Sequence, residues 1–63
     1  GEAAQLAEQE ATIASYNDMI AFLKDQRGLL AEADKSIEEI KAADTLISEE
    51  IKVWEQKIAT ILA

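Results

Sequence analysis

The stretch that decides the fold of this 63-residue chain is Asp34-Lys35-Ser36-Ile37-Glu38-Glu39, residues 34–39. Its last four residues match the capping box S-x-x-E, in which a serine at a helix start and a glutamate three positions later satisfy free backbone amides. The two glutamates would also lie near the positive end of the helix dipole. The pattern predicts a turn at about residues 33–36, followed by a helix from about 36 to 62.

On both sides of this turn, large apolar residues recur at alternating steps of three and four, the spacing of helices that pack on one another. We call these positions the seam. The first stripe contains Leu6, Ile13, Tyr16, Ile20, Leu23 and Leu30, with Gln9 and Arg27 as polar exceptions. The second contains Ile37, Ile40, Ile47, Ile51, Trp54, Ile58 and Ile61, with Asp44 as the exception. The stripes are out of phase, because continuing the first would place Lys41 where the second has Ile40.

The fold class predicted from these stripes is all-α, an antiparallel hairpin of two long helices over about residues 2–33 and 36–62. The chain has no proline, and glycine occurs only at positions 1 and 28. Two alternatives stay open: Gly28 could cap the first helix, and Asp44 could start a third helix in a three-helix bundle. A single long, interrupted coiled coil is a further alternative. In each case, residues 1–63 form one helical domain.

Arg27 and Asp44 are the only charged seam residues. Folding back at the predicted turn brings them level or one layer apart, so we expect an ion pair that sets register and orientation. A parallel in-register dimer would instead stack like charges in the seam, at a much higher cost. The lower cost of one matched ion pair favours the antiparallel hairpin over the parallel dimer.

A second group of apolar residues lies beside the seam, on one face of the predicted hairpin. In an antiparallel pair, the corresponding flanks of both helices share that face. We call this group the lateral patch. Its members are Met19, Phe22, Leu29, Ala43, Leu46 and Val53. Scattered apolar surface residues are ordinary, but clustering on one face predicts an interface.

The predicted function is structural: a self-assembling hairpin or oligomerisation element, with a homodimeric four-helix bundle as the first expectation. So short a chain has a marginal core, and without cysteine or histidine it has no disulfide and lacks the usual zinc ligands. Association with another chain is the remaining reinforcement. Two alternatives are a binding module that docks a partner helix on the same patch, and a coiled-coil fragment of a larger assembly.

The net charge and the composition limit the classes of partner that we expect for this chain. Thirteen acidic residues against six basic ones give a net charge of −7, which disfavours nucleic acid and anionic membranes. We expect a soluble chain with no cofactor, metal site, small-molecule substrate or catalytic activity. Ser15, Ser36 and Ser48 are the only serines, and none has a histidine base. The chain begins at Gly1, so we expect a segment of a longer protein or a processed product; its compartment is not indicated.

Overall fold

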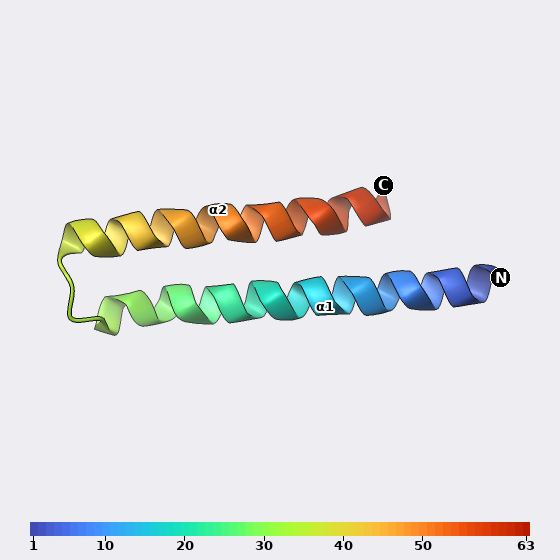
Figure 1. Ribbon diagram of the computed structural model, residues 1–63, viewed down its shortest axis with the longest axis horizontal. Coiled ribbons are helices and arrows are strands. Elements are labelled where there is room, and N and C mark those ends of the chain that lie inside the picture. Colours follow the sequence, from blue (N-terminus) through green and yellow to red (C-terminus); the bar gives the residue numbers. More distant parts are fainter.

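The structure confirms the predicted helical hairpin. The computed structural model describes all 63 residues and contains α1 (Glu2–Leu29), a short 3-10 helix η1 (Leu30–Glu32) and α2 (Ile37–Leu62). The two long helices run side by side in opposite directions, and the N-terminal end of α1 extends beyond the end of α2 (Figure 1). The Cα trace measures 53 × 18 × 8 Å. The molecule is therefore a single layer of two helices.

The turn has the capping geometry that the sequence predicts. Ser36 is extended, with φ −66° and ψ 157°, and its Oγ accepts a hydrogen bond from the Glu39 backbone N–H at 3.2 Å. The same hydroxyl donates to Glu39 Oε1 at 3.1 Å. Ala33 is also extended, so the chain leaves η1 and reverses over residues 33–36 before α2 begins. Ser36 and Glu39 therefore start α2 by satisfying one of its free amides.

Neither alternative break interrupts the helices. Gly28 lies inside α1, no glycine has a positive φ, and α1 passes through Leu30 with helical dihedrals into η1. Asp44 lies inside α2, which is continuous from Ile37 to Leu62. The three-helix bundle is therefore wrong for this chain. The predicted first helix is also slightly too long, because its last turn is the 3-10 helix.

The core is small and lies in the middle of the hairpin. Ile20, Leu23 and Ile51 are the only buried residues of the chain, and Ile51 retains 4% exposure. Partly buried Ile47, Trp54 and Ile58 pack against them. The ends of the seam are open, since Leu6 and Ile37 are exposed. Neither helix has an apolar stretch long enough to cross a membrane.

Candidate functional site

The lateral patch predicted from the sequence supplies five of the eight exposed large hydrophobic side chains of the hairpin. Its five large members, Met19, Phe22, Leu29, Leu46 and Val53, are exposed. Ala43 is half-buried because it turns toward α1. Exposed leucine and phenylalanine side chains leave apolar area in water, where burial by another surface would be favourable.

The pairing of the two helices shows how the patch is arranged along the hairpin. The rings of Tyr16 and Trp54 lie 5.3 Å apart between centroids, at 52° to each other. Nearer the turn, Arg27 Nη1 donates a hydrogen bond to Ser48 Oγ at 3.0 Å. When residues are counted along each helix from these two contacts, the patch residues of α1 and those of α2 are interspersed along the length of the hairpin. At 1.5 Å per residue, the patch is about 18 Å long.

Three charged residues, Glu39, Glu50 and Lys57, share the flank of α2 that carries the patch. Glu50 and Lys57 lie one and two heptads beyond Ala43, and Glu50 is the one charged residue of this flank between Leu46 and Val53. The Nζ of Lys57 lies 4.9 Å from the centroid of the Trp54 ring and 6.0 Å from that of Tyr16. Cation–π attraction therefore holds the ammonium group over the seam aromatics.

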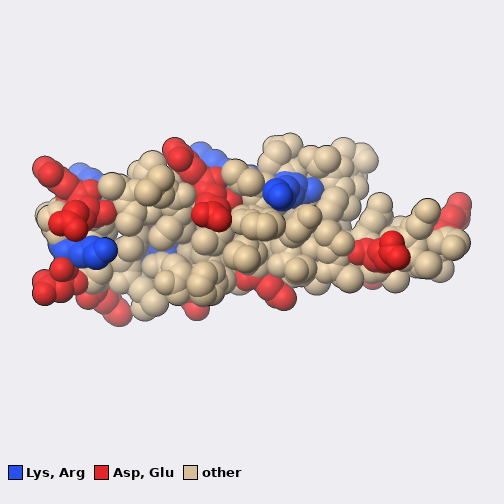
Figure 2. Space-filling view, viewed as in Figure 1, with Lys and Arg blue, Asp and Glu red and all other residues tan.

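The charge distribution on the surface is uneven. On the face that Figure 2 shows, acidic and basic groups crowd the end that carries the turn. Uncharged surface then extends over parts of both helices, broken by acidic groups on α2 and α1 and by a basic group farther along. The hairpin therefore offers broad uncharged surface between charged regions.

The predicted pair of Arg27 and Asp44 is not what the structure shows. Arg27 is half-buried and donates to Ser48, whereas Asp44 is exposed. Near the turn, α2 presents Ala43 to α1 in place of Asp44. The physical reason is that a carboxylate loses hydration when it is buried, whereas an alanine does not. The sequence signal for this arrangement was the small residue Ala43 directly beside the charged Asp44 at the edge of the seam. The sequence analysis did not identify Ser48 as the partner of Arg27.

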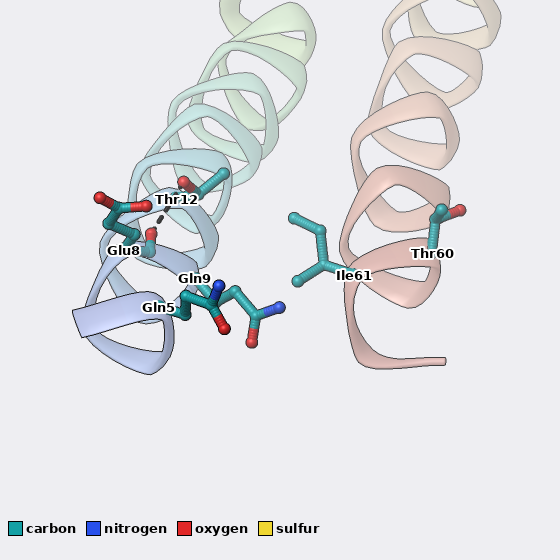
Figure 3. A pocket seen from close by; sticks show the side chains of 6 residues that line it. All are labelled: Gln5, Glu8, Gln9, Thr12, Thr60 and Ile61. Atoms are coloured by element: carbon teal, nitrogen blue, oxygen red, sulfur yellow. Dashed lines mark hydrogen bonds between the residues drawn. The ribbon is translucent and has the colours of Figure 1, made fainter. Parts of the chain in front are cut away.

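The open end of the hairpin forms a polar hollow of about 640 Å³ between the helices. Figure 3 shows its six lining residues, with Gln5, Glu8, Gln9 and Thr12 on α1 and Thr60 and Ile61 on α2. Thr12 Oγ1 donates to the backbone carbonyl of Glu8 at 2.9 Å, so its hydroxyl serves its own helix. Thr60 Oγ1 does the same on α2, where it donates to the backbone carbonyl of Gln56 at 3.0 Å.

A smaller hollow of about 350 Å³ lies along both helices. It is lined by Asn17, Ile20, Lys24, Glu55, Ile58, Ala59 and Leu62. Nowhere do three or more Asp or Glu side chains gather in a way that could hold a metal ion. Of the three serines, Ser36 caps α2 and Ser48 bonds Arg27, while Ser15 is exposed. The lateral patch is therefore the candidate site, on the observation that its five large side chains are exposed.

Comparison of the chain with protein-family models, curated proteins and solved structures finds no match.

Proposed function

We propose that the chain is a self-assembling structural protein in which two hairpins pair through the lateral patch to form a four-helix bundle. The observation that carries this proposal is that the isolated hairpin exposes more large apolar side chains than it buries. Only three side chains are buried, while eight large hydrophobic side chains are exposed. A second layer of helices would cover the patch and convert its exposed area into core.

The size of the molecule supports the same proposal. Isolated two-helix layers bury little surface, and small domains need a further source of stability. The chain has no cysteine for a disulfide. Association supplies the missing burial without any new residue type, because one patch packs on its own copy in a two-fold dimer. The proposed role is thus oligomerisation, without catalysis.

A second hairpin is the preferred partner because it presents the same apolar surface at the same length. A helix of another protein on this patch is the competing function, in the manner of helix-in-groove recognition. The two differ in what the purified chain does alone. A self-assembling hairpin gains helicity with its own concentration, whereas a binding module does so only when a partner is added.

Sedimentation equilibrium over a wide concentration range, with circular dichroism on the same samples, tests the proposal. We expect a reversible monomer–dimer equilibrium in which helicity rises as dimer forms. A chain that stays monomeric and fully helical at all concentrations would contradict self-assembly. A poorly helical monomer at the highest concentration would contradict it too, and would favour the binding module.

A further inference from the structure

The lateral patch is flanked by charged residues, with Glu39 near the turn and Lys57 toward the other end of α2. Resting on the proposed self-assembly, we propose that the second copy packs with its turn at the opposite end, so that Glu39 of each copy pairs with Lys57 of the other. Two-fold packing of this face allows two arrangements, with the turns at the same end or at opposite ends. The charges distinguish them.

The flank of α2 that carries the patch is arranged symmetrically about its midpoint, with Ala43 half-buried at the edge of the seam and the other members exposed. The residues along it are Glu39, Ala43, Leu46, Glu50, Val53 and Lys57, at alternating steps of four and three. Reversing this row on a second copy about Ser48 brings Glu39 onto Lys57 and Ala43 onto Val53. An acidic end therefore meets a basic end, and a small residue meets a larger one. Charge complementarity of this kind fixes the orientation of interfaces.

The patch residues of α1 are also arranged symmetrically about a midpoint, and this midpoint lies at nearly the same level along the hairpin as Ser48. Its central residues are Met19, Phe22, Gln26 and Leu29, and the midpoint of this row is residue 24. Counting from the Tyr16–Trp54 contact puts residue 24 opposite residue 46, and counting from the Arg27–Ser48 bond puts it opposite residue 51. Residue 48 lies between these values. One two-fold axis across the hairpin can therefore serve both rows.

Both members of the proposed pair are already held on the hairpin. Lys57 is fixed over the Trp54 ring at 4.9 Å. Glu39 accepts the Ser36 hydroxyl through Oε1, which leaves its second carboxylate oxygen for a cation. Groups with restricted motion lose less side-chain entropy when they pair. A dimer would contain two such pairs, related by symmetry.

The same-end arrangement lacks this complementarity. There, α2 of one copy faces α1 of the other at equal level. Lys57 would lie near Thr12 and Ser15, and Glu39 near Leu29 and Ala33, so neither charge meets its opposite. Glu50 meets apolar side chains in both arrangements and does not distinguish them.

Two charge-reversed variants test the orientation. Lys57→Glu alone places like charges together twice in its homodimer, and so does Glu39→Lys. We expect each variant alone to dimerise about tenfold or more weakly than the unmodified chain, since two surface pairs change sign. An equimolar mixture restores both pairs in a heterodimer. Its dissociation constant should return to within about threefold of the original, on the same scale.

A distance measurement provides a test that does not depend on those variants. The chain has no cysteine, so Ala4→Cys allows one spin label per copy on an exposed position of α1. Residue 4 lies 20 positions from residue 24, so opposite-end packing separates the labels by about 60 Å at 1.5 Å per residue. Same-end packing keeps them within about 30 Å, given helix spacings of 8–10 Å.

The outcomes separate the two proposals. If the unmodified chain dimerises but mixing gives no recovery, or the labels lie within about 30 Å, the orientation is wrong while self-assembly stands. If the unmodified chain never associates, both proposals fail. Recovery on mixing together with the long label distance supports both.

Discussion

Replacing Phe22 with alanine removes the largest side chain of the lateral patch. Burying a phenylalanine completely stabilises by about 1.5–3 kcal/mol, and Phe22 is 57% exposed in the single hairpin. Covering the exposed part is therefore worth about 0.9–1.7 kcal/mol per copy. A two-fold dimer contains the residue twice, so Phe22→Ala should weaken it by about 2–3 kcal/mol. That corresponds to roughly a 30- to 150-fold higher dissociation constant.

Sedimentation equilibrium measures this change, and Leu6→Ala is the matched control. Leu6 also lies on α1 and is 59% exposed, but it lies outside the lateral patch. Its replacement removes comparable exposed apolar area, and we expect the dissociation constant to stay within about twofold. Alanine is a good helix former, so both variants should keep the helicity of the dimer at high concentration. An affinity change below about threefold for Phe22→Ala, or an equal loss for Leu6→Ala, would refute the assigned interface.

Three further predictions concern the hairpin itself and are checked by chemical or thermal unfolding at a fixed chain concentration. Ser36→Ala removes the cap of α2 and should lower the free energy of unfolding by about 1 kcal/mol; an unchanged midpoint would show that the cap contributes nothing. Ser48→Ala removes the acceptor of the half-buried arginine and should cost about 1 kcal/mol, whereas Asp44→Ala, at an exposed position, should stay within about 0.5 kcal/mol. The reverse ranking would restore the pairing predicted from the sequence. Gly28→Ala should stabilise by about 0.4–1 kcal/mol, because a Cβ there meets no atom within 4 Å and φ is not positive; destabilisation would reveal a neighbour at this position, such as another copy.

The hairpin could be predicted because its signals are local. A capping box needs only residues three apart, and Ser36 with Glu39 forms it as expected. Apolar periodicity needs only the neighbouring turns of one helix, and it placed Ile20, Leu23 and Ile51 in the core. The lateral patch follows from the same periodicity. Apolar residues that lie beside the buried stripe of a two-helix layer are left at the surface. Its large members are indeed exposed.

The partner of Arg27 could not be predicted in this way. Periodicity assigns a face to each helix, but the rotation of a helix about its own axis depends on all its contacts at once. Near the turn, that rotation places Ala43 inward and Asp44 in water. A long arginine side chain then reaches Ser48. Placing Asp44 inward in place of Ala43 would add a desolvation cost, and the size of that cost depends on the neighbouring helix.

The sequence by itself thus determined the helices, the turn and the five large residues of the lateral patch, because each depends on interactions within a few positions of the chain. Only the tertiary structure decided which polar groups meet across the helices, how far α1 extends beyond α2, and how few side chains one hairpin buries. Those features depend on distances between segments that lie far apart in sequence and on the competition between packing and hydration at each contact.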